Sequence, residues 1–381
     1  MTHTNRNLTW VLIAWVTFMG ACNSTAPTGT DQNPSATTET SPPTNPTFEF
    51  DPMWPKQLPN NWTLGNVVGV AVDARDHVWI VHRPGSLTPQ ERAAAATPPL
   101  AECCFPAPPV IEFNQDGDVV QAWGGPGDGY EWPEAEHGIF IDHLDNVWLG
   151  GSGGTDSQIL KFTRNGEFLL QIGAQGLGQG SNDLANFGMP AEIDVDPSTN
   201  EVFIADGYGN RRVAVFDAET GEYRRHWGAY GNVPTDDAYT YNPDDPPSAQ
   251  FGRPVHCASL SNDGLVYVCD RVNDRIQVFQ RDGSFINEVV IAGRTLGFGS
   301  AFDVDFSPDA EQEFLFNIDG MNQKIWVLNR KDLSIVSSFG FGGHMAGGFT
   351  AAHSLAIDSS GHIYVGETLE GKRVQRFLKM N

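Results

Sequence analysis

From about residue 48 onward, short runs of Val, Ile, Phe, Tyr and Trp alternate with polar turns that contain Asp-Gly or Asn. The clearest unit reads HCASLSNDGLVYVCDRVNDRIQVFQRDGSF and begins at His256. It holds three apolar runs of strand length, and related units add a fourth run before a Phe-Gly or Trp-Gly end. Short β-branched and aromatic runs between such turns predict antiparallel strands.

The same unit recurs six times along the chain, once with a long insertion over residues 84–107. Four short strands per roughly 40–50 residues are the signature of a β-propeller blade. The last copy ends after its third strand, and the run TFEF at residues 47–50 is expected to supply the missing fourth one. We therefore predict an all-β fold, a six-bladed β-propeller over residues 47–381.

The first 46 residues have a different pattern. Arg6 precedes an apolar run that ends in Gly20, Ala21 and Cys22, which resembles a bacterial lipobox. We expect residues 1–21 to be a lipoprotein-type signal peptide and Cys22 to be lipidated; a plain secretory signal is the alternative. Residues 22–46 are rich in Ser, Thr and Pro and predict a flexible tether. The expected product is an exported, monomeric bacterial cell-envelope lipoprotein that is held to the membrane by its lipid.

Charge and cysteine content narrow the possibilities further. With 47 acidic and 23 basic side chains the formal net charge is -24, which repels phosphate backbones and argues against nucleic-acid binding. Cys103 and Cys104 are adjacent, whereas Cys257 and Cys269 flank a predicted hairpin turn. The second pair is interpreted either as a disulfide, which an oxidising compartment permits, or as two small buried residues.

Three histidines occupy equivalent positions in the repeat. His137, His256 and His353 each start the innermost predicted strand of units 2, 4 and 6. Alternate blades of a six-fold ring are a third of a turn apart, so these imidazoles can converge on the axis. A single histidine at a strand start is usually an ordinary polar residue, but three neutral imidazoles with a vacant fourth position suit catalytic zinc. The remaining histidines, including His77, His143, His226, His344 and His362, are expected at the surface.

The second strand of each unit should end on the same rim as these histidines. The polar residues at those ends are His82, Arg83, Asp206, Tyr208, Asp270, Arg271, Asp319 and Glu367. We interpret the aspartates mainly as caps of the following turns. Two guanidiniums beside a metal could clamp a carboxylate, and a tyrosine there could transfer a proton.

Several segments carry a resemblance to a known family. The run DRIQVF and its relatives resemble the NHL repeat, and GVAVDARDHVWIVHR, HGIFID, DGYGNRRV, VHCASL, CDRVNDRIQVF and AHSLAID together resemble the catalytic domain of peptidyl-α-hydroxyglycine α-amidating lyases. That family splits a carbinolamide into a peptide amide and glyoxylate at a zinc held by three histidines. The resemblance implies zinc on His137, His256 and His353, carboxylate-binding or catalytic Arg83 and Arg271, and a catalytic Tyr208.

The resemblance also implies a structural calcium at the backbone carbonyls of Val70 and Ile139. The family's third calcium ligand, an aspartate after the last histidine, is Ser354 here. A neutral hydroxyl is a much poorer calcium ligand, so this site is in doubt. A family methionine near the same histidine is Ala351, which could widen the substrate pocket.

The leading hypothesis is a zinc-dependent, lyase-like propeller acting on a hydroxylated, carboxylate-bearing small molecule or peptide. One alternative is a non-catalytic propeller that binds a cell-envelope component, in which removal of Tyr208 would not matter. Another is a calcium-dependent, lactonase-like hydrolase, although such sites are built from carboxylates and amides rather than from three histidines.

Overall fold

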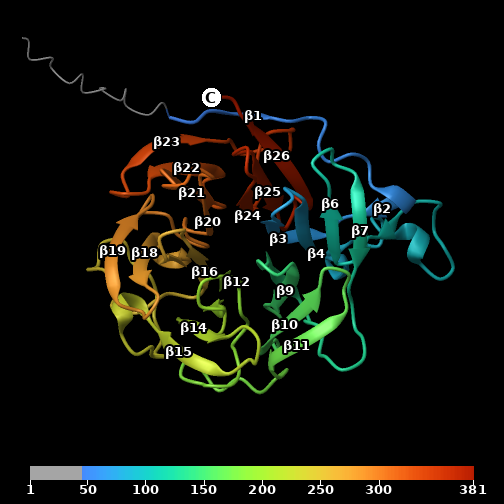
Figure 1. The fold of residues 1–381 in the computed structure, drawn as a ribbon. Helices are drawn as coiled ribbons and strands as arrows, with labels where there is room; N and C mark the ends of the chain where they lie inside the picture. The colour runs from blue at the N-terminus through green and yellow to red at the C-terminus, as the bar shows by residue number, and fades with distance from the viewer. Residues whose placement is uncertain (1–44) are drawn as a thin grey trace, which may run out of the picture. The chain divides into compact units, whose positions relative to one another are not determined.

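The computed structural model describes residues 45–381. Six four-stranded antiparallel sheets follow one another around a common axis, which confirms the predicted all-β six-bladed propeller (Figure 1). Among the described residues, no helix has the length and apolar character needed to span a bilayer. The predicted signal peptide, the lipidated Cys22 and nearly all of the tether lie outside the described residues.

Each blade is numbered by its place in the chain and runs from its innermost to its outermost strand. Blade 1 is β3 (Asn66–Val72), β4 (Val78–Arg83), β6 (Val110–Phe113) and β7 (Val119–Trp123). Blade 2 is β8 (Glu136–Ile141), β9 (Asn146–Gly151), β10 (Gln158–Thr163) and β11 (Phe168–Gly173). Blade 3 is β12 (Glu192–Asp196), β13 (Glu201–Asp206), β14 (Arg212–Asp217) and β15 (Tyr223–Trp227).

The second half of the ring repeats this order. Blade 4 is β16 (Val255–Leu260), β17 (Leu265–Asp270), β18 (Arg275–Gln280) and β19 (Phe285–Val290). Blade 5 is β20 (Asp303–Phe306), β21 (Phe314–Asp319), β22 (Lys324–Asn329) and β23 (Ile335–Phe339). Blade 6 is β24 (Ala352–Ile357), β25 (Ile363–Glu367), β26 (Arg373–Lys379) and β1 (Phe48–Phe50).

The two ends of the described chain close the ring. β1 pairs antiparallel with β26, so that Phe48 lies opposite Lys379 and Phe50 opposite Phe377 (Figure 1). The prediction that residues 47–50 complete the last blade is confirmed. Closure of this kind covers the edge strand of the last blade with the start of the chain.

The core lies between neighbouring blades. In one cluster Phe203 and Val215 of blade 3 pack against Val266 and Phe279 of blade 4, and the other clusters join adjacent blades in the same way. Strands buried between two sheets need apolar residues, which is why the second and third strands of most units have few polar positions.

The insertion at residues 84–107 packs on blade 1. It contains the 3-10 turns η2 (Pro84–Ser86) and η3 (Ala93–Ala95), and β5 (Phe105–Pro106) pairs with β2 (Trp62–Thr63). The other 3-10 turns are η1 (Pro59–Asn61), η4 (Ala229–Gly231) and η5 (Arg271–Asn273). Disulfides join Cys103 to Cys104 and Cys257 to Cys269, so the disulfide interpretation of the second pair is confirmed.

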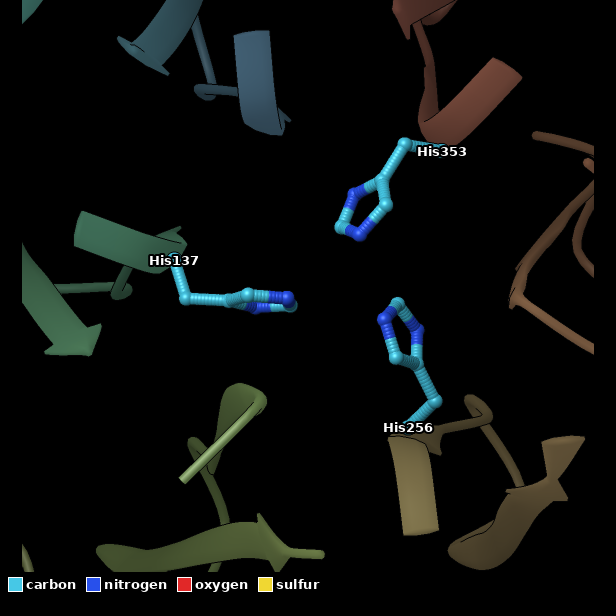
Figure 2. Close-up of side chains that lie close together, drawn as sticks. All are labelled: His137, His256 and His353. Carbon is cyan, nitrogen blue, oxygen red and sulfur yellow. The ribbon is translucent and has the colours of Figure 1, made fainter. Parts of the chain in front are cut away.

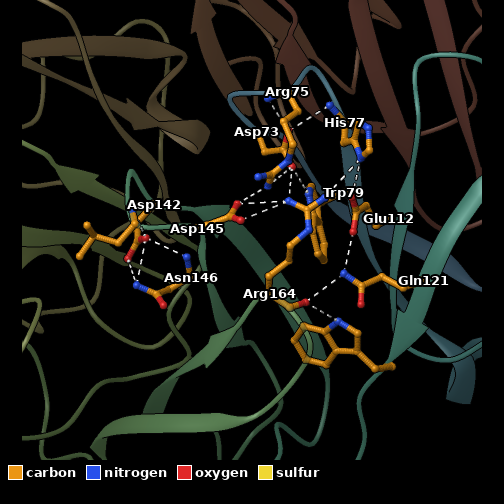
Figure 3. A network of polar contacts seen from close by, with 12 residues as sticks. Asp73, Arg75, His77, Trp79, Glu112, Gln121, Asp142, Asp145, Asn146 and Arg164 are labelled. Atoms are coloured by element: carbon orange, nitrogen blue, oxygen red, sulfur yellow. Dashed lines mark hydrogen bonds and ion pairs between the residues drawn. The ribbon is translucent and has the colours of Figure 1, made fainter.

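A polar network joins blades 1 and 2 where β3 ends, at the far end of that strand from the positions equivalent to the three histidines (Figure 3). Arg164 donates from Nη1 to Asp73 at 2.8 Å and also pairs with the buried Glu112. His77 Nδ1 lies 2.5 Å from a Glu112 carboxylate oxygen. The expectation that His77 is a surface residue is therefore wrong: it is half-buried because it pairs with this carboxylate.

Candidate metal centre

Three imidazoles meet on the axis of the ring. His137, His256 and His353 are each the second residue of an innermost strand, namely β8, β16 and β24. Their exposed fractions are 2%, 3% and 5%, and one ring nitrogen from each lies within 4.8 Å of the others. Figure 2 shows the three rings turned toward a common centre from three separate blades. The convergence expected from the repeat is thus present.

The outer nitrogen of each ring is held by the backbone of the next blade. Nδ1 lies 2.7 Å from Ala191 O in His137, 2.5 Å from Phe302 O in His256 and 3.0 Å from Val68 O in His353. A carbonyl oxygen can only accept, so each Nδ1 carries the hydrogen. In the neutral ring this leaves the Nε2 lone pair free, which is the arrangement found for metal-ligating histidines.

The surroundings keep these rings neutral. Burial is the main cause that lowers the pKa of His137 and His256 well below the usual range, and neighbouring cations add to it. Burial, together with Arg271 and Arg83, lowers the pKa of His353 to about 3. Metal ligation requires the unprotonated ring, so the triad is in its ligand form at neutral pH.

Tyr208 lies against two members of the triad. Its hydroxyl oxygen is 3.0 Å from His137 Nε2 and 3.1 Å from His256 Nε2, and Arg271 Nη1 donates to it at 3.1 Å. A phenol has one hydrogen, so only one of the two Nε2 atoms can receive it. Within residues 45–381, His353 Nε2 makes no hydrogen bond at all. Lone pairs without donors at a buried centre fit a metal cation.

The two rim arginines have no carboxylate partner in the described part of the chain, although most of its other arginines do. Arg83 donates from Nε to Glu136 O at 2.7 Å and from Nη2 to Ser152 Oγ at 2.8 Å. The Arg271 guanidinium packs 4.7 Å from the Phe302 ring, and its buried Nε has no acceptor. A buried cation without a counterion is costly, so both arginines fit a site that binds an anion.

Comparisons with known proteins agree with this geometry. No protein-family model matches the chain. NHL repeat-containing protein 3 of Mus musculus is 27% identical over 360 residues, 88% of this chain and 85% of its own length. The probable peptidyl-alpha-hydroxyglycine alpha-amidating lyase of Caenorhabditis elegans is 25% identical, over 82% of each chain.

Peptidyl-glycine alpha-amidating monooxygenase of Mus musculus is 26% identical over 80% of this chain, which spans only 29% of that protein. Streptogramin B lyase matches in fold, with a TM-score of 0.51 at 11% identity over 87% of this chain and 98% of that one. The chain is a six-bladed β-propeller that is similar to an NHL repeat-containing protein and to a probable amidating lyase.

Other rim residues of this propeller have structural roles. His82 was expected at the mouth but is fully buried, because its Nδ1 accepts from Gly65 N and its Nε2 lies 3.0 Å from Pro108 O. Asp206 accepts from Gly188 N, Asn210 and Arg212. Asp270 and Asp319 hold rim loops in a similar way, as expected for caps of turns.

The residues named for calcium line a cavity of about 230 Å³ that adjoins the triad. Val70 and Ile139 form part of its wall, and Ser354 Oγ accepts from Val70 N at 3.2 Å. This hydroxyl has a backbone partner and also hydrogen-bonds to the Asp303 carboxyl, so it is already engaged within the protein. The calcium site stays a prediction.

Sequence reasoning missed four carboxylates in this cavity. They come from the innermost strands of blades 3 and 5: Glu192, Asp194, Asp303 and Asp305. Each accepts a backbone N–H from the innermost strand of the following blade. Burial raises the pKa of the three aspartates to about 7. The alternating acids in EIDVD and FDVDF were a visible signal.

Proposed function

We propose that this propeller is a metal-dependent lyase of the amidating-lyase type. Its substrate would be an N-acyl-α-hydroxyglycine, which it would split into an amide and glyoxylate. The observation that carries the proposal is the meeting of three Nε2 lone pairs, the Tyr208 hydroxyl and the unpaired Arg271 guanidinium at one buried point. The relatives named as amidating lyases support the same reaction class.

His137, His256 and His353 would hold zinc through Nε2, since their Nδ1 atoms are engaged with backbone carbonyls. When bound there, zinc supplies a Lewis acid that polarises a substrate oxygen. Calcium is a weaker proposal, for which Val70, Ile139 and Ser354 offer two carbonyls and one hydroxyl.

The two arginines differ in the donors they can offer. Arg271 donates one Nη1 hydrogen to Tyr208. Its other Nη1 hydrogen and both Nη2 hydrogens have no acceptor among the described residues, so they can meet a carboxylate in a two-point contact. Arg83 donates its Nε hydrogen and one Nη2 hydrogen to the protein, which fixes its guanidinium and leaves three hydrogens for a substrate oxygen. We assign the substrate carboxylate to Arg271 and the amide carbonyl to Arg83.

Tyr208 is assigned the proton transfer. Arg271 Nη1 donates to its oxygen at 3.1 Å and holds the side chain beside the triad, where it would take the proton of the carbinol hydroxyl. The carbinol C–O bond becomes the aldehyde of glyoxylate while the C–N bond breaks, and the amide nitrogen takes up a proton. Tyr208 can return the proton it received, which balances the reaction without a further reactant.

The test is glyoxylate release from α-hydroxyhippurate by purified protein, before and after chelation and zinc return. Tyr208→Phe should lower turnover by about 10²-fold or more with unchanged thermal stability. Tyr223→Phe is the control, since that hydroxyl pairs with His226 away from the triad. Absence of zinc-dependent release by the wild type would reject the lyase, and lactone hydrolysis with added calcium would favour the hydrolase alternative.

We also propose that the protein is exported and held to the cell envelope through a lipid on Cys22. The two disulfides among the described residues agree with an oxidising compartment. Cys22→Ser should release the protein or leave it unprocessed. Unchanged membrane fractionation of this variant would remove the lipid anchor from the proposal.

A further inference from the structure

A second cavity lies beside Arg83, on the rim that carries the candidate site. It has a volume of about 550 Å³ and is lined by Arg83, residues of η2 and the loop that leads into β8. A volume of this order suits a small ligand or one side chain of a larger one. No role has been given to it above.

The cavity lies next to the candidate site in the chain and through Arg83. Arg83 and Glu136 both line it, and Glu136 is directly followed by the triad residue His137. Arg83 donates to Glu136 O, which holds its guanidinium beside the triad.

The walls of the cavity are mostly apolar. Pro84, Pro109 and Pro126 line it together with the ring of Trp132. Trp132 donates from Nε1 to Glu136 Oε1 at 2.8 Å, and a Cβ at Gly124 would lie 2.8 Å from this ring, so the indole packs directly on that glycine. Glu134 and Glu136 add negative charge at the wall, which disfavours an acidic ligand.

The lining indicates which end of the substrate would lie in the cavity, since Glu134 and Glu136 disfavour the carboxylate and the apolar side chains suit the acyl group. With the carboxylate at Arg271 and the amide carbonyl at Arg83, the acyl group attached to that carbonyl extends past Arg83. We propose that this cavity is the acyl-group subsite and that it selects substrates with an apolar, preferably aromatic, acyl group. This inference rests on the proposed lyase function.

A single substitution can fill the subsite without disturbing the fold. A Cβ added at Gly85 meets no heavy atom of the described chain within 4 Å, and its φ is not in the left-handed region. Gly85 lines the cavity, so Gly85→Leu adds a bulky side chain at its wall. Gly154→Leu is the matched control, since that glycine is equally open, has no positive φ and does not line the cavity.

The first readout is turnover by the full-length protein. Gly85→Leu should lower kcat/KM for α-hydroxyhippurate by about tenfold or more, and change it by less than about twofold for N-acetyl-α-hydroxyglycine. Gly154→Leu should change neither, and both variants should unfold at the wild-type temperature. Equal losses for the two substrates would overturn the subsite.

The second readout does not depend on catalysis. Hippurate, N-acetylglycine and N-succinylglycine are unreactive analogues whose binding can be measured by calorimetry. We expect hippurate to bind about tenfold more tightly than the other two, and Gly85→Leu to remove this preference. If the preference persists in Gly85→Leu, or is absent from the wild type, the inference is wrong. If the preference behaves as expected while no glyoxylate is ever released, the subsite stands and the lyase reaction fails.

Discussion

Three clusters among the described residues each bring three potential metal ligands within 4.8 Å, and two of them are built in opposite ways. In the first, Asp73, His77 and Glu112 surround the guanidinium of Arg164, as Figure 3 shows. In the second, His137, His256 and His353 face one another, as Figure 2 shows, and none of them forms an ion pair within residues 45–381. Each cluster offers three potential ligand residues, but the first contains two carboxylates and one imidazole, whereas the second contains three imidazoles.

The difference shows how a structural cluster can be told from a ligand site. Two buried carboxylates are costly without a cation, and the fold provides one from the neighbouring blade. Three neutral imidazoles need no counterion, and each has only its Nδ1 hydrogen satisfied by a carbonyl. The first cluster is complete as it stands, whereas the second keeps lone pairs for something that the chain does not supply.

The largest effect on stability is expected from removing the arginine at the centre of the first cluster. Arg164→Leu leaves the buried Glu112 without an arginine and Asp73 with only the part-exposed Arg75, and it should lower the free energy of unfolding by about 3–5 kcal/mol. Denaturant unfolding measures it. Arg294→Leu breaks an exposed pair with Asp244 and should stay within about 1 kcal/mol of the wild type. Similar small losses for both variants would mean that the first cluster is not a structural ion network.

An intermediate effect is expected in the pH dependence of the free energy of unfolding, where the neutral triad should differ from ordinary histidines. The pKa of His353 is about 3 in the folded chain against an ordinary value of 6.5. Below 6.5 the unfolded chain thus binds a proton that the folded chain does not, and stability falls as the pH falls.

Metal-free wild type should therefore lose about 2 kcal/mol more than His353→Gln between pH 6.5 and about pH 5. The comparison with the variant cancels the channel aspartates, whose raised pKa acts in the opposite direction. Parallel pH profiles for the two proteins would show that this ring is not held neutral.

The smallest expected effect is weak zinc binding by the first cluster once Arg164 has been removed. Removing Arg164 leaves two carboxylates and one imidazole that could accept a divalent ion in its place. On a His137→Ala background, which disables the triad, Arg164→Ala should gain about 1 kcal/mol of stability from zinc at tenfold excess over its Kd. His137→Ala alone should gain nothing. A gain in both proteins would point to zinc binding elsewhere.

The sequence carried the fold and the triad because both follow from the repeat. Strand period, turn residues and equivalent histidines are local signals that recur at a fixed spacing, so the ring and the convergence of His137, His256 and His353 could be predicted. The pairing of Glu112 with Arg164 could not, since these residues lie in different blades and neither stands in a recurring motif. The prediction that His82 lies at the mouth was wrong. The alternation of side chains along β4 does not reveal that the backbone of Gly65 and Pro108 hydrogen-bonds to its ring.

The metal content of the purified protein tests the role of the triad most directly. Elemental analysis should find about one zinc per wild-type chain and almost none in His137→Ala, His256→Ala or His353→Ala, because a site with three protein ligands loses most of its affinity with any one of them. Arg164→Leu should keep its zinc, since it alters only the other cluster. Zinc absent from the wild type after growth and dialysis with zinc, or full occupancy in two of the three histidine variants, would contradict a metal centre at these histidines.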